Sequence, residues 1–399
     1  MQTTIPINPL SVPVQDPLAV AREVAVAIGD RAVRYDHEAG LPTEEIALLK
    51  ASGLLRLPIP RVYGGGGATW PELYQVVQIL AGASGSIGQL YGNHIVLLNA
   101  AVALGRPGQA EQSFRLTAQH NWLWANALNG RDGRLKIEAA PSGFRVNGVK
   151  SFGTGVAVGD VNVIGATMEG VESPVVFTIP GDRAGLHYSH DWHNMGQRRT
   201  VSGSYRFDEV AVSPEELVGP PADPTSAFPT LVFSLAQLAK VYTYVGIAEG
   251  ALHAARDYTR STARPWQTAE VASASEDPYV LQQYGELWAE LQAAIALAQR
   301  AADQVQAGWE KQTALTFEER GEIAIAVAAA KTIAIKAGLT ITNQIFDVMG
   351  ARATASRFGF DRYWRDLRTF SLHDPRAYKC REIGNWFLHQ VFPVPSQYS

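Results

Sequence analysis

The spacing of apolar residues changes twice along this 399-residue chain, and that change most constrains the fold. From Pro17 to about Arg115, apolar residues recur every three or four positions, which is typical of amphipathic helices. The next region instead carries short alternating runs that predict strands, at Leu135–Ala139, Phe144–Val146, Val175–Ile179 and Ser204–Phe207. Beyond the proline-rich stretch Pro220–Pro224, the helical spacing returns and persists nearly to the last residue.

One dipeptide in the predicted β region carries a turn signal. Asn147-Gly148 separates two apolar runs, and both residues tolerate the positive φ angles of a two-residue hairpin turn. We therefore expect a β-hairpin whose turn lies at this dipeptide.

The last part of the chain predicts a helix bundle. One amphipathic face is marked by Leu287, Leu291, Ile295, Ala298, Ala302 and Val305. Gly321–Gly350 is so rich in alanine and isoleucine that its helix should be buried on several sides. The sequence thus predicts a mainly α protein with a central β domain: a helical domain over residues 1–118, a β domain over 119–228 and a bundle over 229–399.

Composition excludes several classes of function. The 34 basic and 38 acidic side chains give a net charge of -4, which provides no positive field for nucleic acid or an anionic membrane. No run of about 18 apolar residues predicts a membrane span. Because the first basic residue is Arg22, we expect no signal peptide. We therefore expect a cytoplasmic protein. The single cysteine, Cys380, excludes an internal disulfide and a CxxC metal site, and we expect no metal.

The stretch Asp191–Val212 combines Gly196-Gln-Arg198, small hydroxyl residues and a strand ending in Phe207-Asp-Glu-Val210. With the order of helices, β region and bundle, it resembles the acyl-CoA dehydrogenase superfamily over nearly the whole chain. The resemblance implies an N-terminal helical domain, a β-barrel-like middle domain and a C-terminal four-helix bundle. It also implies a flavin ring between the β domain and the bundle, and a homotetramer whose subunits share flavin sites.

The chain departs from the dehydrogenases where they usually carry a glutamate base. The corresponding region reads Ser371-Leu-His-Asp-Pro375, with no glutamate between Asp366 and Arg381. This stretch is similar instead to a second branch of the superfamily, the flavin-dependent monooxygenases that resemble dibenzothiophene monooxygenase. Five other segments agree with that branch: Tyr91–His94, Asn126–Asn129, Lys150–Gly155, Arg264–Trp266 and Gly350–Arg352.

In that branch a separate NAD(P)H:flavin reductase supplies reduced flavin, usually FMN, with FAD as the alternative. The resemblance implies that reduced flavin and O2 form a C4a-hydroperoxide, which needs a dry site and controlled protonation. By resemblance, His94 and His373 are catalytic residues on opposite sides of the flavin's reactive edge, and Thr154 lies at flavin N5. Without the resemblance, His94 is a core histidine, His373 a residue at a helix end and Thr154 only a strand residue, and these alternatives stay open.

Five further side chains are expected to contact the flavin. Arg264 and Arg352 suit its phosphate, because guanidinium groups form paired bonds to phosphate oxygens, although surface ion pairing is the alternative. Asn126 and Asn129 suit the pyrimidine edge of the flavin or the substrate. Trp192 is expected to be either a wall of a flat pocket or a core aromatic residue.

The leading hypothesis is a two-component monooxygenase that uses reduced FMN and O2 to oxygenate a small apolar substrate. Sulfur is the favoured position of attack, ahead of an aromatic or indole-like ring. One alternative is a dehydrogenase that keeps FAD bound and oxidises an acyl thioester. Another is a catalytically silent protein with the same flavin fold that serves as a binding subunit.

Overall fold

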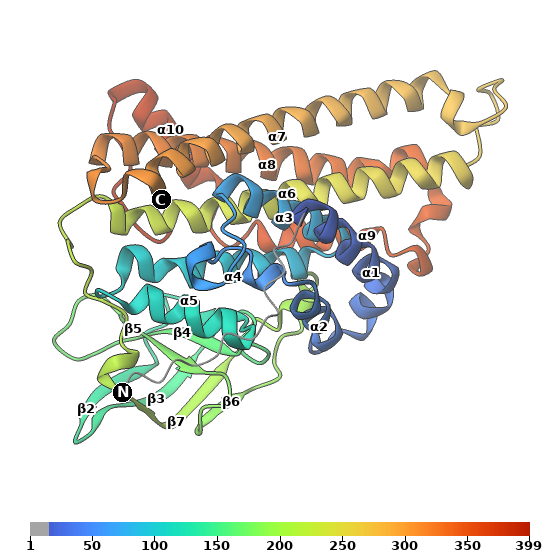
Figure 1. Cartoon of the computed structure of the whole chain (residues 1–399). Coiled ribbons are helices and arrows are strands. Elements are labelled where there is room, and N and C mark those ends of the chain that lie inside the picture. Colours follow the sequence, from blue (N-terminus) through green and yellow to red (C-terminus); the bar gives the residue numbers. More distant parts are fainter. Residues whose placement is uncertain (1–15) are drawn as a thin grey trace.

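The computed structural model describes residues 16–399 of the chain. Helices form its first and last parts, and the strands lie between them (Figure 1). The main helices are α1 (Pro17–Glu38), α2 (Thr43–Ser52), α3 (Trp70–Ala83), α4 (Gly85–Leu104), α5 (Gln109–His120), α6 (Phe228–Ser261), α7 (Pro278–Lys311), α8 (Phe317–Met349), α9 (Asp361–Phe370) and α10 (Arg376–His389). The strands are β1 (Trp124–Ala127), β2 (Lys136–Ala140), β3 (Gly143–Lys150), β4 (Val161–Ala166), β5 (Val175–Pro180), β6 (Leu186–Tyr188) and β7 (Tyr205–Val212). The expected order of helices, strands and helices is confirmed.

The N-terminal helices pack on the long helices of the bundle. On α3, the ring of Tyr74 stacks on that of Tyr242 in α6, with 5.1 Å between the ring centroids. A single hydrophobic cluster contains residues from Ala21 in α1 to Phe370 in α9. The helices before and after the β region therefore share one core, and the division into three domains stays a prediction.

Two sheets make the middle region. The first has the strand order β1-β4-β5, with β1 parallel to β4 and β4 antiparallel to β5. The second has the order β2-β3-β7-β6 and is antiparallel throughout. Apolar side chains of both sheets, including Phe177 and Phe207, form a second core between them.

The prediction of a hairpin turn at Asn147-Gly148 is wrong. β3 continues through both residues, and the turn lies earlier, at Pro141-Ser142 between β2 and β3. The pairing of β3 with β7 shifts register between Val146 and Gly148, which marks a β-bulge. Gly148 has a φ of 119° there, so the positive φ that the dipeptide indicated serves a bulge instead of a turn.

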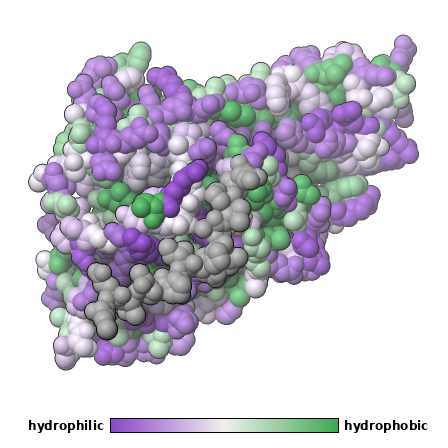
Figure 2. Space-filling model, in the orientation of Figure 1, coloured by the Kyte–Doolittle hydropathy of each residue, from purple (hydrophilic) through white to green (hydrophobic). Residues whose placement is uncertain are grey.

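Three helices, α4, α6 and α8, are long and apolar enough to cross a membrane by length and composition alone. In the protein, 72%, 83% and 61% of their most apolar stretches are buried. Packing against neighbouring helices of the same chain accounts for this hydropathy, as in the core of a helix bundle. On the face seen in Figure 2, hydrophobic side chains lie in small separate patches among hydrophilic ones.

Candidate active site

β1 brings two of the predicted site residues together. The backbone N–H of Asn126 donates to the carbonyl of Thr154 over 3.2 Å. The buried hydroxyl of Thr154 lies 2.9 Å from that of Ser202, which lies 2.8 Å from the hydroxyl of Thr200. The side-chain amide of Asn126 makes no hydrogen bond to residues 16–399, so it is available to a ligand.

Phe152 and Trp192 form an aromatic surface just beyond the end of β3. Phe152 has a φ of 57°, a strained value for a bulky residue, and 59% of it is exposed. The two ring centroids lie 6.2 Å apart with an angle of 78° between the planes. Asn129 donates from Nδ2 to the hydroxyl of Ser151 over 3.3 Å, which places the Asn129 side chain next to this surface.

His94 is fully buried on α4, and both of its ring nitrogens face backbone groups. Nε2 lies 2.8 Å from the carbonyl of Leu55, and Nδ1 accepts from the backbone N–H of Trp124 over 3.2 Å. Since a carbonyl only accepts and an amide N–H only donates, the imidazole is neutral with its proton on Nε2. Burial lowers the pKa of His94 to about 4, which agrees with that state. His94 thus ties α4 to the first residue of β1, two positions before Asn126, and its role in proton handling stays a prediction.

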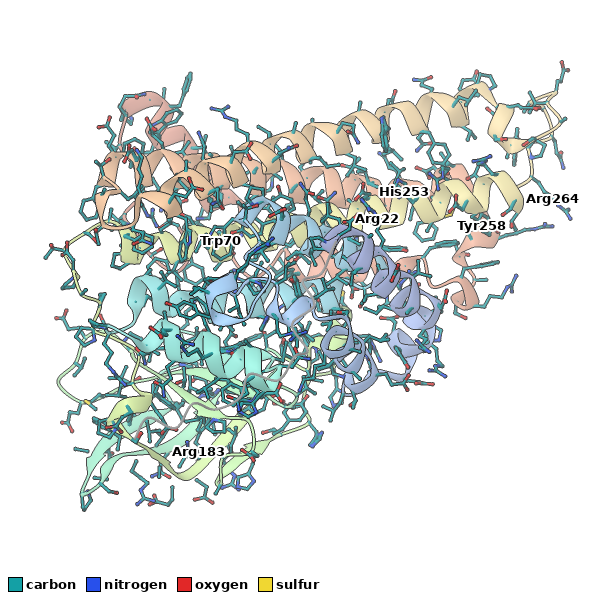
Figure 3. The ribbon with its side chains drawn as sticks, viewed as in Figure 1. Arg22, Trp70, Arg183, His253, Tyr258 and Arg264 are labelled. Carbon is teal, nitrogen blue, oxygen red and sulfur yellow. The ribbon has the colours of Figure 1, made fainter. Side chains whose placement is uncertain are left out.

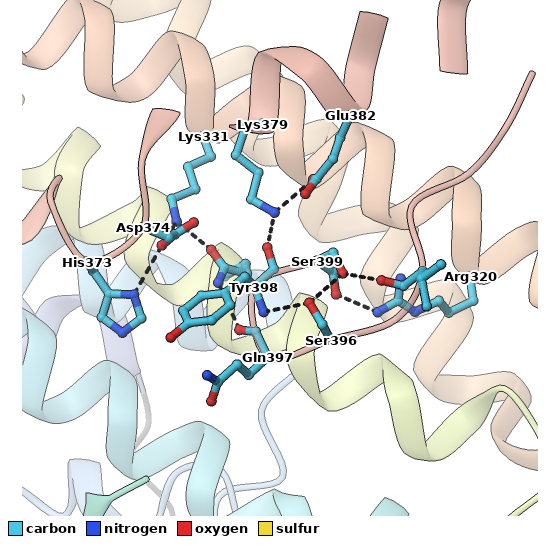
Figure 4. A network of polar contacts seen from close by, with 12 residues as sticks. Arg320, Lys331, His373, Asp374, Lys379, Glu382, Ser396, Gln397, Tyr398 and Ser399 are labelled. Carbon is cyan, nitrogen blue, oxygen red and sulfur yellow. Dashed lines mark hydrogen bonds and ion pairs between the residues drawn. The ribbon is translucent and has the colours of Figure 1, made fainter. Parts of the chain in front are cut away.

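His373 follows the last turn of α9 and lies between two aromatic rings. The ring centroids of Phe370 and Tyr398 are 6.3 and 6.1 Å from that of the imidazole. Nδ1 lies 3.1 Å from Oδ1 of Asp374 (Figure 4), while 42% of the side chain remains exposed. Partial burial and the nearby ammonium group of Lys240 lower the pKa of His373 to about 4. A neutral imidazole that donates its Nδ1–H to Asp374 presents an unprotonated Nε2.

α9 connects the two halves of the site. The backbone N–H of Gln197 donates to Oδ1 of Asp366, a buried residue of α9, over 2.5 Å. The carbonyl of Gln197 accepts from Nε1 of Trp192 and from the hydroxyl of Thr200, each over 2.8 Å. Burial raises the pKa of Asp366 to about 6. The helix that ends beside His373 is therefore anchored to the loop that carries the aromatic and hydroxyl groups.

Arg264 and Arg352 do not join this cluster within one chain. Arg264 follows α6, and Arg352 lies in the short helix η7 (Ala351–Thr354) just after α8; both are exposed. Near the same ends, the hydroxyl of Thr259 donates to the carbonyl of Val348 over 3.4 Å. Figure 3 shows Arg264 at the tip of the bundle that points away from the β domain. Their predicted contact with a flavin phosphate stays a prediction.

The groups gathered around β1 fit a flavin. An isoalloxazine ring is flat and largely apolar, with carbonyl and N–H groups along one edge. The amide of Asn126 and the hydroxyl of Thr154 could supply donors and acceptors for that edge, while the Asn129 amide already bonds to Ser151 and to the backbone N–H of Arg131. The exposed ring of Phe152 supplies a flat apolar surface.

Comparison with known families and structures agrees with this fit. The family described as "Acyl-CoA dehydrogenase, N-terminal domain" matches residues 18–119, and "Acyl-CoA dehydrogenase, C-terminal domain" matches residues 238–375. The structure of methanesulfinate monooxygenase MsuC from Pseudomonas fluorescens has a TM-score of 0.93 and 40% identity, covering 96% of this chain and 100% of that one. TdsC from a Paenibacillus species, in complex with FMN and indole, has a TM-score of 0.91 and 39% identity, covering 96% and 99%.

Similar sequences also belong to flavin-dependent monooxygenases. A probable FMNH2-dependent monooxygenase, SfnC, from Pseudomonas putida is 41% identical over 98% of this chain and 99% of its own length. Dibenzothiophene monooxygenase from Mycolicibacterium goodii is 41% identical over 95% of each chain, whereas a putative acyl-CoA dehydrogenase of Bacillus subtilis is 26% identical. Fold and site together define a flavin-dependent oxidoreductase. The chain belongs to the acyl-CoA dehydrogenase family, in its flavin-dependent monooxygenase branch.

Two residues of this site were missed by sequence reasoning. Phe152 lies inside the quoted segment Lys150–Gly155, but its exposure depends on a backbone angle that its own side chain disfavours. Lys331 is completely buried on α8 and bonds to Asp374. It is the sole charged residue of Ile323–Ile335, and a lone lysine in such an apolar helix was a usable signal.

Proposed function

We propose that this monooxygenase binds FMN, reduced by a separate NAD(P)H:flavin reductase, and transfers one oxygen atom to sulfur in a small apolar substrate. Reduced FMN supplies two electrons to O2, whose second oxygen atom leaves as water. One observation carries the proposal: the neutral imidazole of His373, backed by Asp374, lies partly exposed at the end of α9. The glutamate base that dehydrogenases use is missing from this stretch, and its carboxylate, Asp374, is buried and bonded to Lys331 and His373, which disfavours dehydrogenation.

Binding and drying of the site fall to the groups around β1. Asn126, Asn129 and Thr154 would hold the polar edge of the flavin, and Phe152 and Trp192 would cover its apolar surface. Since Thr200 donates to the carbonyl of Gln197, donation from Ser202 to Thr200 and from Thr154 to Ser202 would leave a Thr154 lone pair for a ligand donor. Such a preorganised hydroxyl binds a ligand atom with little reorganisation.

His373 would hold and move a proton at Nε2. A group with a pKa lowered to about 4 is neutral near pH 7, so this nitrogen would accept a hydrogen bond, and transiently a proton, from a bound species. Asp374 keeps Nδ1 protonated and orients the ring, as the carboxylate does in other histidine–carboxylate pairs. We also propose that His94 acts at the opposite side, at least by fixing β1 and hence Asn126.

Sulfur is favoured as the position of attack by two lines of support. Similar proteins are named for dibenzothiophene and methanesulfinate, both sulfur compounds. The rings of Phe370 and Tyr398 beside His373 offer apolar contacts to an uncharged substrate. An indole-like ring is the second candidate, because the TdsC structure of 39% identity holds indole with FMN.

We further propose a cytoplasmic homotetramer with flavin sites shared between subunits. Exposed aromatic and aliphatic side chains at the two ends of the bundle support contacts between copies, among them Trp266, Tyr279, Trp288, Phe387 and Leu388. Such contacts would bring Arg264 and Arg352 of one copy to the β1 region of another. A surface of this kind favours assembly over an isolated chain.

The decisive experiment supplies the purified protein with FMN, a generic flavin reductase, NADH and 18O2, and screens sulfides, sulfinates and indoles by product mass. We expect one 18O atom in a sulfoxide-type product and none from labelled water. Tightly bound FAD that is bleached anaerobically by an acyl-CoA would instead identify a dehydrogenase. Absence of any oxygenated product, with no effect of the protein on flavin oxidation, would identify a silent binding subunit.

His373→Ala should separate oxygen activation from oxygen transfer. General acid–base groups contribute about 100- to 10,000-fold, so we expect product formation to fall at least about 100-fold while H2O2 release rises. The measurement compares product with H2O2 at equal NADH consumption. His37→Ala, which changes an exposed histidine in the last turn of α1, is the control and should leave the ratio unchanged. Equal product in both variants would remove His373 from the mechanism.

A further inference from the structure

Lys331 is a fully buried lysine in the middle of α8, and no step described so far uses it. A lysine is almost never completely buried unless its ammonium group is paired. Its Nζ donates to Oε1 of Gln237 on α6 and to Oδ1 of Asp374. Figure 4 shows Asp374 between Lys331 and His373. The pairing satisfies the lysine and places a cation next to the carboxylate below about pH 7, because burial lowers the pKa of Lys331 to about 7.

The same carboxylate oxygen serves both neighbours. Oδ1 of Asp374 accepts from Lys331 and lies 3.1 Å from Nδ1 of His373, while Oδ2 has no partner within residues 16–399. Asp374 itself is 5% exposed. A buried carboxylate stays ionised only when charges and donors compensate it. Burial raises the pKa of Asp374, but the hydrogen bond with His373 and then the charges of Lys331 and Lys240 hold it well below its usual value.

Other ionisable groups also face this cluster. Lys240 and Tyr244 approach from α6, and the Tyr244 hydroxyl donates to the carbonyl of Phe370 over 3.1 Å. From α10, Lys379 is paired with Glu382 over 2.9 Å. The ring of Tyr398 lies beside His373. Of the lysines that face the cluster, Lys331 is the one bonded to Asp374 among the described residues.

We propose that Lys331 is a positioning residue, whose ammonium group holds Asp374 in the orientation that keeps His373 protonated on Nδ1 and unprotonated on Nε2. The proposal rests on the function proposed above for His373. An ordinary core ion pair would hold α8 against the end of α9 and change only stability. A positioning role also predicts changes in the titration of His373 and in the partition between product and H2O2.

The sign of the titration change follows from charge. Lys331⁺ and Asp374⁻ sum to zero, so replacing Lys331 by methionine leaves a net negative charge next to the imidazole. A negative charge favours the protonated form, so the His373–Asp374 pair keeps a proton to higher pH. Protonation removes the free lone pair on Nε2. As the pH falls, Lys331→Met should therefore lose oxygen transfer at a higher pH than the wild type does.

The first experiment compares Lys331→Met, Lys331→Arg and Lys336→Met. Lys336 is exposed on the same helix, so its variant removes one charge from α8 without touching the cluster. For Lys331→Met we expect at least about tenfold less product per NADH, and an acid limb of the pH profile moved up by about one unit. Lys331→Arg should restore much of the product, and Lys336→Met should match the wild type. A lower melting temperature with an unchanged pH profile and product ratio would overturn the proposal.

A chemical titration keeps this result separate from the identity of the reaction. Diethyl pyrocarbonate reacts with neutral imidazole and not with its protonated form, so the extent of modification at His373, located by mass spectrometry and followed against pH, reports the protonation of this residue. No substrate is needed. An upward shift of the midpoint in Lys331→Met supports the positioning role even if no sulfur compound is oxygenated. An unshifted midpoint contradicts it even if the wild type is an active monooxygenase.

A double variant covers the case in which Lys331→Met fails to fold. Lys331→Met with Asp374→Asn removes both charges, which is tolerated far better than removing one partner of a buried pair. If Lys331 acts through Asp374, the double variant should make product within about twofold of Asp374→Asn alone. A further large loss in the double variant would show that Lys331 acts by another route and would overturn the proposal.

Discussion

At the scale of single residues, the two predicted histidines are neutral for different reasons. His94 has both nitrogens bonded to backbone and no exposed surface. His373 has one nitrogen bonded to a carboxylate, no hydrogen bond at the other within residues 16–399, and a side chain that is 42% exposed. A buried imidazole with both positions satisfied stabilises the fold, and a partly exposed one with a free nitrogen suits proton transfer. The structure therefore separates the two residues by the chemistry that each can perform in this state.

His94 should make the fold sensitive to acid. Its pKa of about 4 in the folded chain lies below the ordinary value of 6.5, so the unfolded chain binds a proton that the folded chain does not. The stability that this difference contributes is fully present above about pH 6.5 and is lost as the pH falls toward 4. The loss at pH 4.5 is about 2 to 3 kcal/mol of the free energy of unfolding. Denaturant titrations should show a smaller loss for His94→Gln between pH 7 and pH 4.5. An equal loss for both proteins would contradict this assignment.

At the scale of elements, close backbone contact fixes α3 against α6. A Cβ added at Gly246 would lie 2.2 Å from the carbonyl oxygen of Gln78, and one added at Gly250 would lie 2.2 Å from that of Gly82. Only glycine permits such an approach. α6 also carries Gln237, which bonds to Lys331, and Tyr244, which bonds to the carbonyl of Phe370. The contact between α3 and α6 therefore helps to fix the position of these two residues beside His373.

Gly250→Ala should therefore destabilise the protein despite the higher helix propensity of alanine. The added methyl group meets backbone that cannot move aside, and overpacking of this kind costs about 1 to 3 kcal/mol. Gly285→Ala is the matched control, because nothing lies within 4 Å of a Cβ at that position of α7. It should raise stability by about 0.5 to 1 kcal/mol. Chemical denaturation measures both, and equal effects of the two variants would exclude tight packing as the cause.

The sequence predicted elements well where periodicity decides them. The runs around Ile137, Val146, Phe177 and Phe207 became β2, β3, β5 and β7, because alternation directly reports burial on one face of a sheet. Asn147-Gly148 misled because positive φ serves bulges as well as hairpins. The local sequence indicates that a residue adopts a positive φ, while pairing with the neighbouring strand decides whether that residue forms a turn or a bulge.

At the scale of the whole molecule, the fold and its class were predictable, but the spatial grouping of the site was only partly so. Asn126 and Thr154 were predicted together and lie together, because one bridge joins their backbones. Lys331 could not be assigned to His373 from sequence, since 42 positions separate them and only the bundle brings them together. Arg264 lies at the tip of the bundle that points away from the β domain, and Arg352 follows the end of α8, which periodicity cannot place relative to the site.

Shared flavin sites would make FMN binding depend on both ends of the molecule. Arg264→Ala and Arg352→Ala should each weaken binding of reduced FMN about tenfold or more, because a charged partner of a phosphate contributes well above 1 kcal/mol. Arg300→Ala, an exposed arginine on α7, is the control and should leave binding unchanged. Anaerobic fluorescence titration measures the affinity.

Mixing variants tests the sharing itself. Co-expression of Arg264→Ala with Thr154→Ala places an intact arginine and an intact threonine on different chains, so a fraction of mixed sites would be complete. We expect partial recovery of product formation beyond either variant alone. No recovery, together with mixed oligomers demonstrated by mass, would assign all flavin contacts to one chain.

The four-residue strand β1 has a practical consequence for protein engineering. Its first residue is held by His94 and its third is joined to Thr154, so a change in β1 would disturb both sides of the site at once. Libraries meant to broaden the range of accepted compounds should therefore spare Trp124–Ala127. The exposed ring of Phe152 is a better position to randomise, because its side chain can be exchanged without breaking those connections.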